Sequence, residues 1–142
     1  MSTTEIFANQ PATVVFHQIN MSFLAEPQQP LLTGPSTVIA GFNYMWTCVC
    51  TGGRPAPTMI MRIENVIFTS AVSQTNILQS DDTYNITSIL SWTPTVGNIG
   101  NTLYCEILHA ETLGNNSKNA RIQLTVNGTL KTYMVLNFAS IV

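Results

Sequence analysis

The sequence has few charged residues. Asp, Glu, Lys and Arg make up 8% of the 142 residues, whereas they account for about 25% in typical soluble domains. The formal net charge is -2, so the chain lacks the basic excess with which proteins bind nucleic acid or anionic membranes. We therefore expect Ser, Thr, Asn and Gln to cover the surface, and we do not expect nucleic acid as a partner.

The sequence also lacks the usual patterns of catalytic and metal sites. It contains no nucleophile elbow or phosphate-binding loop, and no paired carboxylates at strand ends. Asp81, Asp82 and Asn85 are close in sequence, but no further spaced carboxylates complete a calcium cage, and a solvated turn is expected. His17 and His109 are isolated, and His109 is expected in the core or at its rim. We expect no enzyme, no metal and no cofactor.

Short segments of alternating apolar and polar residues recur along the chain, and no sustained helical periodicity does. Shared parity places apolar side chains on one face of a strand; this holds for Phe42, Tyr44, Trp46 and Cys48, for Ile86, Leu90 and Trp92, and for Leu103, Cys105 and Ile107. Further strands are expected over 31–40 with a break at Gly34-Pro35, over 58–67, within 68–82 and over 120–126. The pattern predicts an all-β fold, with Trp92 buried.

The sequence contains three cysteines. Cys48 and Cys50 share the inward parity of their strand, and Cys105 has the inward parity of its own. Either of the first two could therefore pair with Cys105, and Cys50 could instead bind another chain or remain a buried thiol. A bond between Cys48 and Cys105 would join two sheets across the core and contribute roughly 4 kcal/mol by the chain-entropy model.

Three motifs in order resemble a known domain. They are Cys48-Val49-Cys50-Thr51-Gly52-Gly53-Arg54-Pro55-Ala56-Pro57, Ser88-Ile89-Leu90-Ser91-Trp92-Thr93-Pro94, and Asn98-Ile99-Gly100 followed by Leu103 and Cys105. With them, residues 30 to 126 resemble the constant-like immunoglobulin domains of nectins and nectin-like adhesion molecules. The resemblance implies a Greek-key sandwich of two antiparallel sheets, a Cys48–Cys105 disulfide and a free Cys50. Met61 stands near the family's core Trp position, and Leu103 stands where a Tyr often precedes the second cysteine.

The sequence suggests three segments: an N-terminal tail with a Pro-containing linker at 1–29, an immunoglobulin-like domain at 30–127, and a C-terminal tail at 128–142. The first segment could hold the remnant of a preceding domain. Residues 1–18 show no signal peptide, and the apolar stretch 133–142 is too short for an ordinary membrane span. We therefore expect a piece of a longer extracellular protein or an incomplete gene model. A cytosolic protein with reduced cysteines is the alternative.

Four acceptor sequons for N-glycosylation support an extracellular location. Their asparagines are Asn20, Asn85, Asn115 and Asn127. Together with a structural disulfide they favour the secretory pathway and the ectodomain of a membrane protein at the cell surface. The membrane contact would then be made only through an anchor outside this chain.

The resemblance implies a non-catalytic module of an adhesion or recognition receptor, which binds a homophilic or heterophilic protein or spaces another domain from the membrane. In that family, domains of this type sit nearer the membrane, which favours the spacer. A soluble secreted recognition protein that binds its ligand directly is the alternative. If the domain binds a partner, the strands at 58–67, 102–110 and 120–126 present the expected face. Its outward residues are Ile60, Arg62, Glu64, Tyr104, Glu106, Leu108, Arg121, Gln123 and Thr125, of which Ile60, Arg62, Tyr104, Glu106, Leu108 and Arg121 are the expected contacts.

Overall fold

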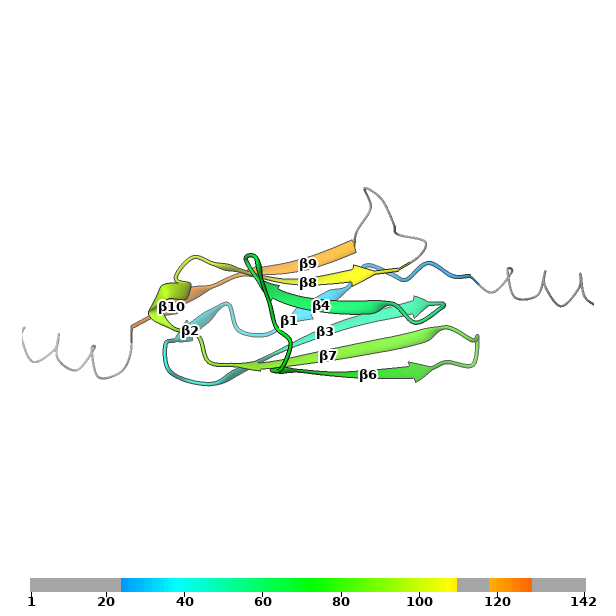
Figure 1. Ribbon diagram of the computed structural model, residues 1–142, viewed down its shortest axis with the longest axis horizontal. Coiled ribbons are helices and arrows are strands. Elements are labelled where there is room, and N and C mark those ends of the chain that lie inside the picture. The colour runs from blue at the N-terminus through cyan, green and yellow to red at the C-terminus, as the bar shows by residue number, and fades with distance from the viewer. Residues whose placement is uncertain (1–23, 110–117, 129–142) are drawn as a thin grey trace, which may run out of the picture.

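Two four-stranded antiparallel sheets face each other in the computed structural model, which describes residues 24–109 and 118–128 (Figure 1). The first sheet has the order β1 (Leu31–Thr33), β3 (Tyr44–Gly53), β7 (Tyr84–Trp92) and β6 (Val72–Leu78). The second has the order β5 (Val66–Ile67), β4 (Thr58–Ile63), β8 (Thr102–Leu108) and β9 (Lys118–Gln123). A 3₁₀ turn, η1 (Val96–Asn98), precedes β8. The predicted all-β sandwich is confirmed.

The predicted break at Gly34-Pro35 separates two short strands that pair with different partners. β1 pairs with β3, whereas β2 (Thr37–Ile39) pairs in parallel with β10 (Thr125–Asn127). Gly34 has a φ of 148, and a Cβ at this position would lie 2.3 Å from Cδ1 of Trp46. Only glycine therefore lets the chain pass this close to the indole ring while it leaves the first sheet.

The core lies between the sheets, and Trp46 is its largest fully buried side chain. Its indole Nε1 donates a hydrogen bond to the carbonyl oxygen of Pro35 at 2.9 Å. Trp92 has the inward orientation that was predicted, but it is only half-buried because it is the last residue of β7. Its ring centroid lies 5.9 Å from that of Trp46 and 5.2 Å from that of Phe68. Phe42 lies before β3 begins and is 45% exposed, so its parity did not place it in the core.

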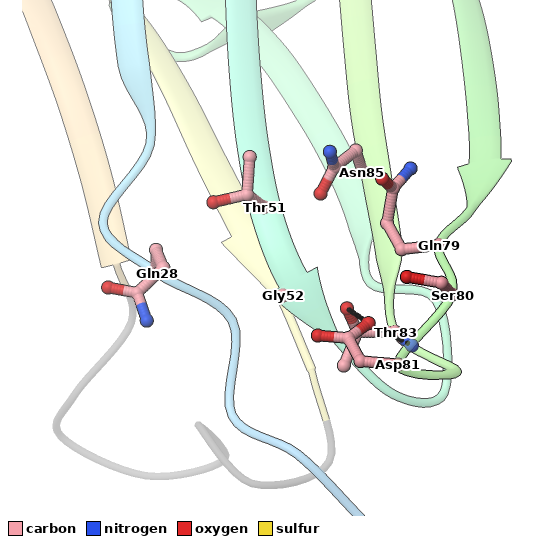
Figure 2. A pocket seen from close by; sticks show the side chains of 8 residues that line it. All are labelled: Gln28, Thr51, Gly52, Gln79, Ser80, Asp81, Thr83 and Asn85. Carbon is pink, nitrogen blue, oxygen red and sulfur yellow. Dashed lines mark hydrogen bonds between the residues drawn. The ribbon is translucent and has the colours of Figure 1, made fainter.

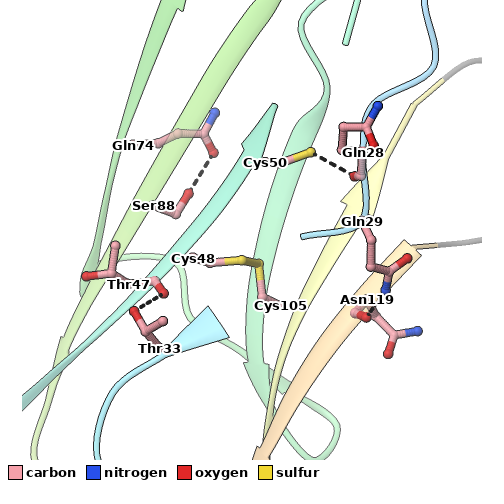
Figure 3. The surroundings of a disulfide bond; sticks show 10 residues. All are labelled: Gln28, Gln29, Thr33, Thr47, Cys48, Cys50, Gln74, Ser88, Cys105 and Asn119. Atoms are coloured by element: carbon pink, nitrogen blue, oxygen red, sulfur yellow. Dashed lines mark hydrogen bonds between the residues drawn. A yellow bond between two sulfur atoms is a disulfide. The ribbon is translucent and has the colours of Figure 1, made fainter. Parts of the chain in front are cut away.

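A disulfide joins Cys48 on β3 to Cys105 on β8 and links the two sheets (Figure 3). The Cα atoms are 6.4 Å apart, within the range that a disulfide spans. Cys50 is buried and free, and its Sγ–H donates to the carbonyl oxygen of Gln28 at 3.4 Å. Burial raises the pKa of the Cys50 thiol. The predicted pairing and the free Cys50 are both confirmed.

Met61 and Leu103, the two departures from the family pattern, are both core residues. Met61 is 1% exposed and Leu103 is fully buried. A flexible thioether can fill a space that a larger ring would otherwise occupy. Methionine at position 61 and leucine at position 103 are therefore compatible with a well-packed core.

Two expected strands are each divided in the structure. The segment 58–67 forms the hairpin β4–β5, with a turn at Glu64 and Asn65. The segment 120–126 is divided at the buried Leu124, after which β10 leaves β9 to pair with β2. Both divisions change which side chains share the outer face of the second sheet.

The segment before β1 is packed along the domain. Ala25 and Arg54 exchange two backbone hydrogen bonds, of 2.9 and 3.0 Å. The backbone N–H of Gln28 donates to the carbonyl oxygen of Thr51 at 2.8 Å. Glu26 forms a 2.8 Å ion pair with Lys118 of β9. Composition suggested a linker here, but prolines also suit an extended edge segment, and Pro27 is fully buried.

Candidate functional site on the outer face of the second sheet

A row of four residues crosses the outer face of the β5-β4-β8-β9 sheet. Arg62 pairs in register with Ile67 on one side and with Tyr104 on the other, and Tyr104 pairs with Arg121. Cross-strand partners on one face bring their side chains within contact distance. The structure thus brings together Arg62, Tyr104 and Arg121, which were predicted to share a face, and adds Ile67.

Arg62 is held in place by three neighbours. Its Nη2 lies 2.6 Å from Oε1 of Glu106, and its Nε donates to the same oxygen at 3.1 Å. The guanidinium carbon lies 3.9 Å from the centroid of the Tyr104 ring, a cation–π contact. Nη1 also donates to the carbonyl oxygen of Glu64. The hydrogen bonds that Arg62 donates to the Glu106 carboxylate raise the pKa of Arg62 above its already high value, so the cation is permanent and already ordered.

Apolar side chains flank this charged centre. Leu108 is 46% exposed and pairs in register with Thr58, and Ile60 is half-buried beside Glu106. On the β5 edge, Ile67, the register partner of Arg62, is 53% exposed. A charged and aromatic centre with an apolar surround has the composition of many protein interfaces.

Arg121 has a different environment from Arg62. It is exposed, and within residues 24–109 and 118–128 it forms no ion pair. A shallow hollow of about 380 Å³ lies beside it, lined by Thr102, Arg121 and Gln123. The ion pair of Arg62 and Glu106 therefore does not extend to Arg121, which leaves Arg121 available to an external acidic group.

Two residues expected on this face lie elsewhere. Glu64 is in the β4–β5 turn with a φ of 46, and its carboxylate accepts a hydrogen bond from the amide of Thr102 at 2.5 Å. Thr125 belongs to β10, which pairs with β2. The pattern of 58–67 predicts one strand, which would place Ile67 on the inner face, whereas the hairpin places it beside Arg62 on the outer face. The Glu64-Asn65 pair between Ile63 and Val66 was the available signal, since Asn is favoured in two-residue hairpin turns.

The other candidate residues, His109 and Asp81, form hydrogen bonds within the fold. His109 is buried, with Nε2 2.9 Å from the carbonyl oxygen of Pro55. Asp81 accepts hydrogen bonds from the hydroxyl and the amide of Thr83 at 2.7 and 3.1 Å, and these lower the pKa of Asp81. Among the residues that the structure describes, no three His, Cys, Asp or Glu side chains gather as a metal site. The same residues contain no helix with the length and apolarity to cross a membrane.

The four sequons fall in different parts of the chain. Asn85 is half-buried on β7 in the first sheet, and Asn127 is exposed at the end of β10. Asn20 and Asn115 lie outside the described residues, as do His17 and both terminal stretches. Neither described sequon is on the outer face of the second sheet.

Residues 24–116 match the family model of the CD80-like C2-set immunoglobulin domain. No curated protein is significantly similar to the chain in sequence.

Solved structures with the same fold include several ectodomains. The chain is similar to Rst D1-D2, with 20% identity, a TM-score of 0.62, and coverage of 71% of this chain and 49% of that one. It is similar to the mouse nectin-like molecule 4 ectodomain Ig1-Ig3, with 15% identity, a TM-score of 0.62, and coverage of 73% and 35%. For bovine butyrophilin the values are 13% identity, a TM-score of 0.56, and coverage of 70% and 44%. The chain spans half or less of each of these.

Proposed function

Because the chain belongs to the family of CD80-like C2-set immunoglobulin domains, we propose that it is an extracellular module of a cell-surface adhesion or recognition receptor that binds another protein. Its fold is shared with the ectodomain of a nectin-like molecule. A disulfide in the core suits the oxidising environment outside the cell. The proposed activity is recognition without catalysis.

One observation carries the proposal: the outer face of the second sheet has an ordered cation beside an aromatic ring, surrounded by exposed apolar groups. Arg62 is already fixed by Glu106 and Tyr104, so a partner that contacts them immobilises few side chains, which reduces the entropic cost of binding. Tyr and Arg are also the residues that most often dominate binding energy at interfaces. We assign the contact to Ile60, Arg62, Tyr104, Glu106, Leu108 and Arg121.

The outer face of the first sheet is less suited to specific recognition. Its cross-strand rows are uncharged: Val49, Thr87 and Thr75 form one, and Thr47, Ile89 and Ser73 form another. Charge complementarity across an interface steers association and excludes wrong partners, and these rows have no charge to supply it. The second sheet therefore offers the better site.

The face also indicates the chemistry of its partner. Arg121 is open and next to Tyr104 in register, so it can take a carboxylate from the partner. Leu108 and Ile67 are exposed on either side of the Arg62–Tyr104 centre, so they suit apolar groups of the partner. We propose a partner surface with an acidic residue next to aliphatic or aromatic groups. A second copy of the chain could supply these through Glu106 and Leu108.

A spacer is the second candidate function. The chain covers 49% of Rst D1-D2 and 35% of the nectin-like ectodomain, so it corresponds to part of each of those ectodomains. In such an assembly a rigid domain can hold another binding domain away from the membrane. A membrane-spanning segment in the full-length protein would support a receptor and argue against the alternative, a soluble secreted recognition protein.

Binding by the chain itself separates the two candidate functions. The glycosylated chain would be secreted with an added leader, displayed on fluorescent beads, and mixed with beads that carry the same chain and with a panel of cultured animal cells. Saturable binding that is competed by the soluble monomer supports recognition by this domain. Absence of binding to both, with the disulfide formed and cooperative unfolding intact, supports the spacer.

A further inference from the structure

An open groove of about 380 Å³ lies on the first sheet, at the end where β7 begins (Figure 2). Gln28, Thr51, Gln79, Asp81, Thr83 and Asn85 are among the residues that line it. The lining consists of hydroxyl, amide and carboxylate groups together with backbone. A groove of this size is in the range of small-ligand sites, and its lining suits a ligand rich in hydroxyl groups.

The wall of the groove contains a modification sequon. Asn85 is followed by Ile86 and Thr87, and Asn85 and Thr87 lie on the outer face because β-strand residues two apart share a face. Among the described residues, no hydrogen bond engages the Asn85 carboxamide, whereas Asp81 is already held by Thr83. Asn85 is thus the sequon asparagine among the residues that line this polar groove.

We propose that Asn85 carries an N-linked glycan whose first N-acetylglucosamine lies in this groove. In the transfer, the donor is an oligosaccharide linked to a polyprenyl diphosphate. A bond forms between Nδ2 of Asn85 and the anomeric carbon, the bond from that carbon to the diphosphate oxygen breaks, and Nδ2 loses a proton. This inference rests on the extracellular location that the proposed function assigns, but it does not depend on which face binds protein.

The surroundings of Asn85 fit a bound sugar. Ile77 is the cross-strand partner of Asn85 and is 57% exposed, so the C–H face of the sugar ring can cover it. Thr51 offers a hydroxyl and Gln79 its amide oxygen within the same groove, while the Gln79 amide nitrogen already donates to the carbonyl oxygen of Ile77 at 3.1 Å. Met45 and Leu31 on the same sheet are 58% and 64% exposed. A glycan over this uncharged sheet would keep its apolar groups from self-association and leave the second sheet for protein contacts.

Occupancy is tested first. The full chain, given a secretion leader, is expressed in cultured animal cells, and glycopeptide mass spectrometry measures Asn85 in both the secreted and the cell-retained protein. High occupancy at Asn85 is expected, with loss of the glycan in Asn85→Gln and Thr87→Ala and retention in the matched control Thr87→Ser. An unmodified Asn85 in both fractions would overturn the inference, whatever the outcome of the binding assays.

The groove contact is tested by trimming. An endoglycosidase that leaves one N-acetylglucosamine on Asn85 is expected to preserve the melting temperature and the slow hydrogen exchange of residues 77–85. Asn85→Gln is expected to lower the melting temperature by roughly 3 °C and to speed that exchange. Gln79→Ala combined with Thr51→Ala should reproduce the faster exchange while Asn85 stays occupied. If the trimmed, unmodified and groove-variant proteins exchange alike, the sugar does not lie in the groove.

Discussion

The guanidinium of Arg62 lies 3.9 Å from the ring centroid of Tyr104, its cross-strand partner, and the same guanidinium forms a 2.6 Å ion pair with Glu106. The Arg62 and Glu106 side chains are 23% and 27% exposed, so water screens the pair only in part. The arrangement connects β4 to β8 and orders the centre of the candidate interface without a partner. It also makes Arg62 a poor site for testing binding alone, because a change there disturbs the sheet.

The first prediction concerns this pair. In a double-mutant cycle of Arg62→Ala and Glu106→Ala, we expect a coupling free energy of about 0.5–1 kcal/mol, in the range of partly exposed pairs on a sheet. Urea unfolding of the two single variants and the double variant measures it. The coupling should shrink at high salt, as the pair is screened. Strictly additive losses would show that the ion pair makes no contribution.

The second prediction compares the two tryptophans. Trp46 is fully buried and hydrogen-bonded to Pro35, whereas Trp92 is half-buried at a strand end. Trp46→Ala should therefore cost about 3–5 kcal/mol of unfolding free energy, the range for large aromatic truncations in cores. Trp92→Ala should cost roughly half as much. Chemical denaturation measures both, and an equal or reversed order would contradict the described core.

The third prediction concerns the free thiol of Cys50. Because burial raises its pKa in the folded state, the neutral thiol is favoured by folding. Its contribution to stability is complete below the unfolded pKa of about 8.5 and is lost as the pH rises from there towards the folded pKa. We expect the decline in unfolding free energy above pH 8.5 to be shallower in Cys50→Ala than in the wild type.

Labelling checks the same point independently. Iodoacetamide should modify Cys50 slowly at pH 8 in the folded protein and rapidly after denaturation, with Cys48 and Cys105 protected in their disulfide. Fast modification of the folded chain would mean that the thiol is accessible.

The strand pattern made most of the sandwich predictable. Cys48 and Cys105 lie on inward positions because alternation along β3 and β8 is regular, and the family motifs selected Cys48 over Cys50. Leu90 and Ile86 are buried for the same reason. Where side chains alternate between core and solvent, parity alone decides their face.

Other features depend on contacts that a local pattern does not contain. The chain turns at Glu64 without a Gly or Pro in the turn, so the β4–β5 hairpin and the position of Ile67 were missed. β10 continues the alternation of β9 while it changes partner at Leu124, and this placed Thr125 on the wrong sheet. Pro27 is buried only because the N-terminal segment packs against β3 and β9, a long-range contact.

The most direct test of the central claim is the binding of Arg121→Glu and Leu108→Ala to whichever bead or cell surface the wild-type chain binds. Both residues are exposed on the outer face of the second sheet. Each variant should weaken binding at least about tenfold, as expected for interface residues that contribute strongly to binding energy, with the melting temperature nearly unchanged. Thr75→Glu and Met45→Ala, at exposed positions of the other sheet, are the matched controls and should bind like wild type. If the controls lose binding while Arg121→Glu and Leu108→Ala retain it, the second sheet is not the interface.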